Sequence, residues 1–328
     1  MFFRSACCTL LFLLCIAALP SLARAQQTPP DYPLEMARLL GQLRSYSQER
    51  NATFQLLGNG SLDLFAPETL TPSARTLVNT SLDGILMESY FYGWEMKDDE
   101  ATPPEARLAW SSALTAAQQL NQPLFNIDYC RSTAAVADSY QKNRQAGFVS
   151  LAAPNRQLTK LPQKTQRSNR SDVSRLAQAK NFLVLLNPEE FASRSLYLAA
   201  LRACAFDLLI IDPTFNSSPL TPDEVRSLKR KPQGGQRLVL AYLSIAEAED
   251  YRPYWQKDWK QSPPAWLVAA NPDWVGNFKV RYWQSGWQQL LFGSRNAQLD
   301  RILSTDFDGA MLDVVDGYQY FLDNPDVQ

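Results

Sequence analysis

Short, continuously apolar runs alternate with longer stretches of helical period along most of this sequence, and no other feature restricts the fold as much. Runs that are apolar throughout, rather than at every second residue, are typical of parallel strands buried on both faces. Strands are predicted over 54–57, 84–87, 123–127, 147–151, 181–186, 206–211, 237–245 and 307–314. Helices are predicted between them, for example over 104–120, 133–145, 193–204 and 286–304.

Eight strands that alternate with helices predict a single closed (β/α)8 barrel, the TIM barrel. The alternative is an open, doubly wound sheet. A dinucleotide-binding sheet of this kind is disfavoured because no Gly-x-Gly-x-x-Gly follows a predicted strand. No Walker-type phosphate loop is present either.

Two segments interrupt the alternation of strands and helices. The segment 163–174 is polar and basic, so we expect an exposed linker there. The segment 250–287 is long and holds six of the eight tryptophans, and we expect it to wall a cleft at the end of the barrel. Most of these tryptophans should pack against the barrel, and one or two should contact substrate.

The N-terminal segment 1–25 has the pattern of a signal peptide, with Arg4 before an apolar segment over 10–20 and the small-x-small sequence Ala23-Arg24-Ala25 at the end. The protein is therefore predicted to be exported, to the periplasm or out of the cell. A membrane anchor is disfavoured by the shortness of the apolar segment, and a lipoprotein signal at Cys15 is disfavoured by the bulky Leu14 before it. No later stretch is long and apolar enough to span a membrane.

Histidine is absent from the chain, and this narrows the chemistry that the chain can carry out. The Ser-His-Asp and Cys-His mechanisms and the usual zinc sites need histidine, so no metal and no cofactor are expected. The formal net charge of −1 gives no reason to expect nucleic acid as a partner. Cys130 and Cys204 remain after signal removal and could form a disulfide. Hydrolysis of glycosidic bonds is the large reaction class that runs on two carboxylates alone.

Acidic side chains follow several predicted strands, at the end of a barrel where active sites form. They are Glu88, Asp128, Asp212, Glu247, Glu249, Asp313 and Asp316. Each one alone could merely cap the next helix, but together they should converge on one rim. There, neighbouring charges would move the pKa values apart and create an acid and a base. Asp212 and Glu249 are one βα unit apart and should lie on adjacent strands, with Glu247 as a competitor for Glu249.

Three segments resemble glycoside hydrolase family 114, the endo-α-1,4-polygalactosaminidase family. They are YLSIAEAEDYRPYW over 242–255, NPDWVGN over 271–277 and FDGAMLDVVDGY over 307–318. The resemblance implies a TIM barrel that cleaves polymers of α-1,4-linked galactosamine or N-acetylgalactosamine, such as biofilm exopolysaccharides. It also implies polysaccharide as the partner, with exopolysaccharide machinery as a further candidate.

By this resemblance, Asp212 and Glu249 are the catalytic carboxylates, with Glu247 as the alternative to Glu249. The side chains expected to bind substrate are Glu88, Asp128, Tyr242, Arg252, Trp274, Asn277, Asp313 and Asp316. One departure is Ala246, where the family has glycine; it could disturb the turn that presents Glu247. A non-catalytic carbohydrate-binding barrel is therefore a second hypothesis. A deacetylase is disfavoured because it would need histidine as a metal ligand.

The order of the parts also departs from the family, and this suggests a circular permutation. Segments near 54–60, 83–93 and 147–150 resemble the family's last strands, although they come first here. We therefore expect 26–50 to be a lead-in, 51–162 to supply the first part of the barrel, 163–178 to be the linker and 179–328 to supply the second part. The rival is a separate N-terminal domain beside a truncated catalytic one, which would leave exposed sheet edges.

Overall fold

The computed structural model describes residues 29–327. The signal peptide predicted over 1–25 lies outside the described residues. Within the described part, no helix is both long and apolar enough to cross a bilayer.

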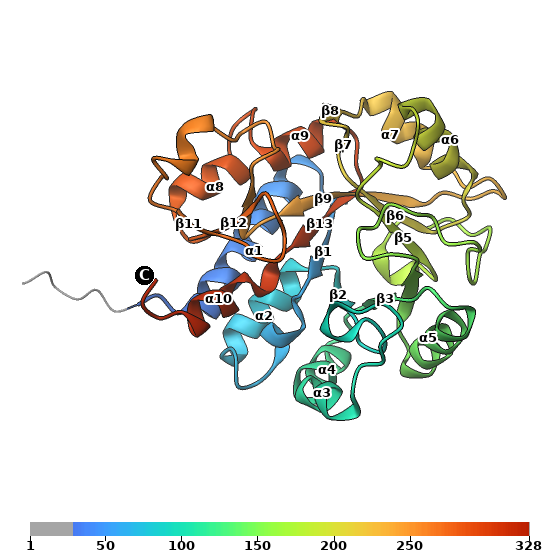
Figure 1. Ribbon diagram of the computed structural model, residues 1–328, viewed down its shortest axis with the longest axis horizontal. Helices are drawn as coiled ribbons and strands as arrows, with labels where there is room; N and C mark the ends of the chain where they lie inside the picture. The colour runs from blue at the N-terminus through green and yellow to red at the C-terminus, as the bar shows by residue number, and fades with distance from the viewer. Residues whose placement is uncertain (1–28, 328) are drawn as a thin grey trace, which may run out of the picture. The chain divides into compact units, whose positions relative to one another are not determined.

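Eight parallel strands form one sheet in the order β4-β3-β2-β1-β13-β9-β6-β5, with helices around them (Figure 1). The strands are β1 (Gln55–Asn59), β2 (Gly84–Glu88), β3 (Leu124–Tyr129), β4 (Val149–Ala153), β5 (Phe182–Leu185), β6 (Leu208–Ile211), β9 (Leu238–Ser244) and β13 (Gly309–Asp313). The end strands β4 and β5 also lie in contact, so the sheet nearly closes into a barrel. The predicted (β/α)8 barrel is thus confirmed, and all eight predicted strands belong to it.

The interior of the barrel is filled by alternate residues of each strand, as expected from the two-residue period of a strand. The inward-facing cluster includes Leu57, Leu86, Phe125, Ile127, Phe182, Leu208, Ile210, Leu240 and Met311. The other residues of each strand pack outward against the helices. This alternation decides which strand-end side chains can reach the mouth of the barrel.

The helices mostly follow the predicted segments, but two of those segments are broken. They are α1 (Tyr32–Arg50), α2 (Pro72–Ser81), α3 (Pro104–Ala109), α4 (Ser111–Gln119), α5 (Thr133–Ala146), α6 (Arg194–Ala203), α7 (Pro222–Leu228), α8 (Ser285–Leu291), α9 (Gln298–Ser304) and α10 (Tyr318–Asp323). The segment 104–120 breaks at Trp110, and 286–304 breaks where Gly293 adopts φ +97°. Strand β4 begins later than predicted because Gly147 (φ +79°) ends α5 in the left-handed conformation.

Short elements complete the chain. The 3-10 turns are η1 (Leu62–Phe65), η2 (Trp94–Met96), η3 (Leu176–Gln178), η4 (Lys257–Lys260) and η5 (Val315–Gly317). The strands outside the barrel are β7 (Thr214–Phe215), β8 (Ser218–Pro219), β10 (Glu247–Glu249), β11 (Leu267–Ala270) and β12 (Asn277–Val280).

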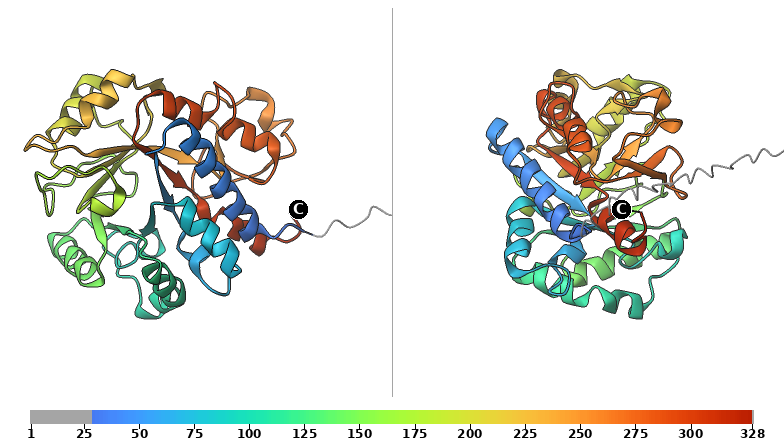
Figure 2. Two further views of the ribbon diagram at one scale, coloured as in Figure 1. Left: turned by 180° about the vertical axis from the view of Figure 1, so that it is seen from behind. Right: turned by 90° about the vertical axis from the view of Figure 1, so that its left-hand side faces the viewer.

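The segment expected as a lead-in forms helix α1, which lies beside α2, α9 and α10 (Figure 2). Arg44 fastens it to the barrel: it donates 2.8 Å and 2.9 Å hydrogen bonds to the carbonyls of Ser81 and Phe54, and it pairs with Asp83. Helix α1 precedes β1 and α10 follows β13, and these two strands are neighbours in the sheet. The first and the last helix of the described chain, α1 and α10, therefore lie in contact beside these two neighbouring strands.

Both parts of the chain build the same sheet, since β1 to β4 join the later strands through the β1–β13 ladder. The alternative of a separate N-terminal domain is therefore wrong. A circular permutation requires one intact barrel, and this is what the sheet shows. The permutation itself concerns the order of the parts in relatives and stays a prediction.

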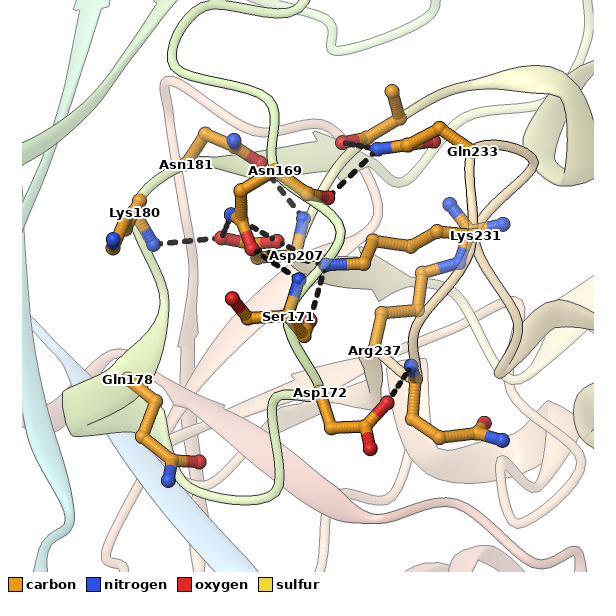
Figure 3. Close-up of polar contacts among 12 residues, drawn as sticks. Asn169, Ser171, Asp172, Gln178, Lys180, Asn181, Asp207, Lys231, Gln233 and Arg237 are labelled. Atoms are coloured by element: carbon orange, nitrogen blue, oxygen red, sulfur yellow. Dashed lines mark hydrogen bonds and ion pairs between the residues drawn. The ribbon is translucent and has the colours of Figure 1, made fainter.

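The linker is mostly exposed as predicted, but it is fixed at the end of the barrel opposite the strand C-termini (Figure 3). Lys231 and Asp207 form an ion pair of 2.8 Å with both side chains fully buried. Asn169 donates to both Asp207 oxygens at 2.9 Å and 2.7 Å, and Lys231 donates to the Ser171 carbonyl at 2.7 Å. A buried ion pair needs such additional donors and acceptors, and the linker supplies them.

Strands β11 and β12 of the tryptophan-rich segment join β10, which directly precedes that segment, in a small antiparallel sheet of order β10-β12-β11. Neighbouring indole rings of the segment pack together, with centroids 5.3 Å apart for Trp255–Trp259, 4.9 Å for Trp259–Trp266 and 5.2 Å for Trp266–Trp287. Most of the tryptophans are therefore packing residues, as predicted.

Cys130 and Cys204 are both free thiols, so the disulfide that they could have formed is absent. The reason is topological. Cys130 follows β3 at the C-terminal end of the strands, whereas Cys204 ends α6 at the opposite end of the barrel.

Candidate active site

A cavity of about 1010 Å³ opens at the C-terminal ends of the barrel strands. Of the predicted site residues, ten line it: Glu88, Asp212, Tyr242, Glu247, Glu249, Arg252, Trp274, Asn277, Asp313 and Asp316. Trp274 belongs to the tryptophan-rich segment and is 43% exposed at the rim. The cavity also draws on residues before 163, so both parts of the chain build it.

Asp128 is the predicted site residue that does not line the cavity, and its assignment to substrate binding is corrected. It is fully buried, and Ser139 (2.7 Å), Asn143 (2.8 Å) and the backbone N–H groups of Phe91 and Tyr92 donate to it. The cause is the strand period: Ile127 and Tyr129 face the barrel interior, so Asp128 faces helix α5.

Asp212 and Glu249 lie on either side of one cation, Arg252. The Arg252 guanidinium contacts the Asp212 carboxylate at 2.8 Å and the Glu249 carboxylate at 2.7 Å. Tyr251 donates a further hydrogen bond of 2.6 Å to Glu249, and Thr214 donates to Asp212 from its N–H (2.8 Å) and its hydroxyl (2.7 Å). Burial opposes the charge of Arg252, but the two carboxylates raise its pKa, so it stays a cation.

Glu247 and Glu249 face the same cavity from β10, as their shared strand parity predicted. Both are almost fully buried, Glu249 being 1% exposed. Glu247 accepts hydrogen bonds from Asn271 (2.8 Å) and Asn277 (3.0 Å) and pairs with Lys279. These donors hold Glu247 in place, as Arg252 and Tyr251 hold Glu249, at the wall of the cavity.

Glu88 and Asp313 are held together by a single side chain, Asn59. The Asn59 amide nitrogen donates to Glu88 at 2.7 Å and to Asp313 at 2.8 Å. Because both acceptor oxygens lie on the same nitrogen, the distance between them cannot exceed the sum of these two hydrogen-bond lengths. Tyr129 donates a hydrogen bond to the other Glu88 oxygen, and Tyr242 donates to Asp313.

The pKa of one member of the pair, Asp313, is raised by its surroundings. Burial and the neighbouring charge of Glu88 raise the pKa of Asp313 to about 6. Asp316 lies beside them and remains accessible from the cavity, although protein surrounds it. Burial, together with Asp313 and Glu88, raises its pKa to about 7.

The backbone after each member of the pair is unusual. Ser89, next to Glu88, has φ +56°, and Val314, next to Asp313, has φ +62°. The left-handed region is unfavourable for a β-branched residue such as valine, and such strain concentrates at functional sites. Ala246, by contrast, is outside this region, so its backbone conformation does not require glycine.

Several residues of the site were not predicted from the sequence. Asn59 stands between two glycines at the end of β1, a position that could have drawn attention to it. Tyr129 follows Asp128, and strand parity could have identified it in place of Asp128. Lys279 lies in β12 and Asn271 directly follows β11, and the sequence carries no signal for their pairing with Glu247. Among residues 29–327, no three acidic or cysteine side chains converge as a metal site.

Comparison with known proteins bears on the second part of the chain. The sequence model of glycoside-hydrolase family GH114 matches residues 163–327. An uncharacterised protein of Deinococcus radiodurans is 43% identical over 122 residues, which are 37% of this chain and 37% of that protein. One of Methanocaldococcus jannaschii is 36% identical over 122 residues, which are 36% of this chain and 33% of that protein. The matches thus span about a third of the length of these relatives.

A solved structure is matched more distantly. The crystal structure of Aspergillus fumigatus Ega3 in complex with galactosamine is 19% identical, with a TM-score of 0.28 and 49% of each chain covered.

Proposed function

Because the chain belongs to glycoside-hydrolase family GH114, we propose that it hydrolyses the α-1,4 bonds of a galactosamine or N-acetylgalactosamine polymer. The observation that carries the proposal is the pair of Glu88 and Asp313 on one Asn59 nitrogen. Glycosidic hydrolysis needs two carboxylates beside the scissile bond, and these two are accessible and close together. Burial and the charge of Glu88 also raise the pKa of Asp313.

Asp313 is the general acid in this proposal, because its raised pKa of about 6 lets it hold a proton nearer neutral pH than an ordinary aspartic acid. Glu88, the other member of the pair, is then the nucleophile, and hydrogen bonds from Tyr129 and Asn59 hold its carboxylate in place. In retaining enzymes the two carboxyl groups lie about 5–5.5 Å apart. One oxygen of Glu88 and one of Asp313 accept from the same nitrogen, and this close approach favours that class.

The reaction then has two steps. Glu88 attacks the anomeric carbon while Asp313 passes its proton to the leaving oxygen, so the glycosidic bond breaks and a glycosyl ester forms. Asp313, now a carboxylate, takes a proton from water, and the resulting oxygen attacks the same carbon and releases Glu88.

Asp212 and Glu249, the pair predicted from the sequence, remain the alternative catalytic carboxylates because both line the same cavity. Their shared Arg252 argues for a different role, since its guanidinium already contacts the Asp212 carboxylate at 2.8 Å and the Glu249 carboxylate at 2.7 Å. In the proposal, Asp212, Glu249 and Arg252 together orient the substrate at the cavity wall.

Reducing-end release from an α-1,4-galactosamine polymer, with the anomeric form of the first product followed by NMR, tests the proposal. Wild-type protein should release reducing ends with retained configuration, and the double variant Glu88→Gln/Asp313→Asn serves as the blank. Binding of the polymer without any release would favour a non-catalytic carbohydrate-binding barrel. Inverted product would reject the two-step route.

Export to the periplasm or the exterior, and work on exopolysaccharide there, are part of the same proposal. They rest on the signal-peptide pattern of residues 1–25. Detection of the mature chain outside the cytoplasm, with an N-terminus near residue 26, would test this part.

A further inference from the structure

We propose that the linker and the loop beside it present a basic face, at the end of the barrel opposite the cavity, that docks the protein on a surface of anionic phospholipid. The basic face consists of five exposed cationic side chains: Arg167, Arg170, Arg175, Lys180 and Arg230. None of them lines the cavity, so the inference does not depend on the proposed function.

Hydrogen bonds hold the linker backbone across the end of the barrel at which the strands begin. The Arg167 carbonyl accepts a 3.0 Å hydrogen bond from Asn181, which directly precedes β5. The Lys180 N–H donates at 2.9 Å to Asp207, which directly precedes β6 (Figure 3). The basic stretch 167–180 therefore begins and ends at this end of the barrel.

Arg170 and Arg230 belong to the same surface, because the linker lies on the loop that precedes β9. Arg230 forms an isolated bridge with Gln236, and the Val173 N–H donates to the Gln236 carbonyl at 3.1 Å. The Arg170 carbonyl lies so close to Gly235 (φ +84°) that a Cβ there would be 2.3 Å from its oxygen. The linker and this loop thus form one continuous surface.

The apolar side chains of the linker are turned away from the basic face. Val173 and Leu176, which flank Ser174 and Arg175, are 3% and 1% exposed, and both belong to the cluster inside the barrel. The Leu176 N–H also donates at 3.2 Å to the Gln55 side chain, at the start of β1. Arg175 is thus fixed by buried neighbours while its own side chain is exposed. The face offers charge without a large apolar side chain for insertion into a membrane.

The protein itself does not neutralise the basic face. Segment 163–180 holds five basic residues and one acidic residue, Asp172. The Asp172 carboxylate accepts a 2.7 Å hydrogen bond from the Gln236 N–H. Among residues 29–327, no acidic side chain forms an ion pair with a side chain of the basic face. The acidic residues that directly precede other strands at this end have cations of their own: Asp83 pairs with Arg44, Asp207 with Lys231 and Asp308 with Lys229.

An anionic phospholipid surface matches this face better than nucleic acid does. Cations near such a surface are attracted to it, and a guanidinium can bind a phosphate through two parallel hydrogen bonds. Single-stranded nucleic acid is bound by stacking of its bases on aromatic rings, and segment 163–181 contains none. Duplex DNA takes a helix or a β-ribbon into its groove, whereas segment 163–181 contains only the turn η3. Docking on lipid leaves the cavity open, because the two lie at opposite ends of the barrel.

The test is the partition of residues 26–328, which contain the whole barrel, onto phospholipid vesicles. In about 0.1 M salt, wild-type protein should bind vesicles of phosphatidylglycerol and phosphatidylcholine and should not bind vesicles of phosphatidylcholine alone. This binding should be lost in about 1 M salt, where charges are screened beyond about 3 Å. Arg170→Gln/Arg175→Gln should lower the partition coefficient about 25-fold, since each cation near the surface contributes roughly fivefold.

Lys180→Gln/Arg230→Gln should give a similar loss, so that the result does not depend on one pair of changes folding well. Lys257→Gln/Arg295→Gln is the matched control, because it removes two exposed cations that lie outside the basic face, and it should bind as wild type does. Equal binding to both kinds of vesicle, binding that persists at high salt, or an equal loss in the control would overturn the proposal. Tighter binding to a short DNA duplex than to the anionic vesicles would assign the face to nucleic acid instead.

Discussion

Glu88 and Asp313 come from different parts of the chain, yet a carboxylate oxygen of each accepts a hydrogen bond from the same Asn59 nitrogen, at 2.7 Å and 2.8 Å. Strand β1, which carries Asn59, lies between the strands of the two acids, β2 and β13. The pair thus forms only when the early strands join the later ones in one barrel. Residues 163–327, which the family model matches, contain just one of its members.

Removal of the shared donor should change both rate and pH dependence. In Asn59→Ala the two carboxylates lose the group that holds them together, and we expect kcat to fall roughly 10²-fold. The Asn59 hydrogen bond lowers the pKa of Asp313, so its loss should move the basic limb of kcat/KM to higher pH. If the pH profile of Asn59→Ala had its basic limb at the wild-type pH, the proposed role of Asn59 between the two carboxylates would be contradicted.

The wild-type pH profile should report the general acid. Asp313 must be protonated to act, and its pKa is raised to about 6, so kcat/KM should decrease as the pH rises through that region. A substrate with a good leaving group, such as a nitrophenyl galactosaminide, needs no proton, and its kcat/KM should lack this decrease. Asp313→Asn should accordingly retain more activity on this substrate than on the polymer, whereas Glu88→Gln should lose both.

Asp316 should lower the stability of the free protein at high pH. Its folded-state pKa of about 7 is above the ordinary value, so its contribution to stability is present at pH 4 and is lost as the pH rises through 7. After allowance for its exposure, we expect Asp316→Asn to raise Tm by about 2 °C at pH 8 and not at pH 4. Calorimetry at the two pH values checks this, with Asp273→Asn as the control. Equal changes at both would contradict it.

Asp128 should matter for folding and not for substrate. Asp128→Asn replaces an acceptor oxygen by an NH2 donor that faces buried donors, including those of Ser139 and Asn143, and should cost about 3 kcal/mol of unfolding free energy. At an assay temperature well below the lowered Tm, KM for the polymer should equal the wild-type value. An unchanged urea midpoint, or a raised KM, would show that the side chain has a different role.

The barrel could be predicted from the sequence because strands and helices differ locally. A strand that is buried on both faces is apolar at every residue, whereas a helix on the outside of the barrel alternates apolar and polar residues with helical period. The sequence also placed most acidic residues at the correct rim, since strand ends follow from the same runs. Asp128 was misplaced because a strand end alone does not say which face a side chain takes. Tyr129, one residue later, shares the inward face with Ile127.

The partners of the carboxylates could not be predicted, because they depend on which side chains from distant segments meet. Nothing local to Asp212 or Glu249 indicates that one arginine joins them, and nothing near Glu88 indicates that Asn59 joins it to Asp313. These contacts decide which pair can exchange a proton. The sequence therefore identified the set of acidic residues but could not assign their roles.

The turnover of four single variants on the same polymer tests the central claim most directly. Asp313→Asn and Glu88→Gln should each lower kcat by about 10³-fold or more, because each removes a group that acts on the reacting atoms. Asp212→Asn and Glu249→Gln should chiefly raise KM, with kcat within about tenfold of wild type. Wild-type turnover in Asp313→Asn, together with its loss in Asp212→Asn and Glu249→Gln, would contradict the account and restore the pair predicted from the sequence.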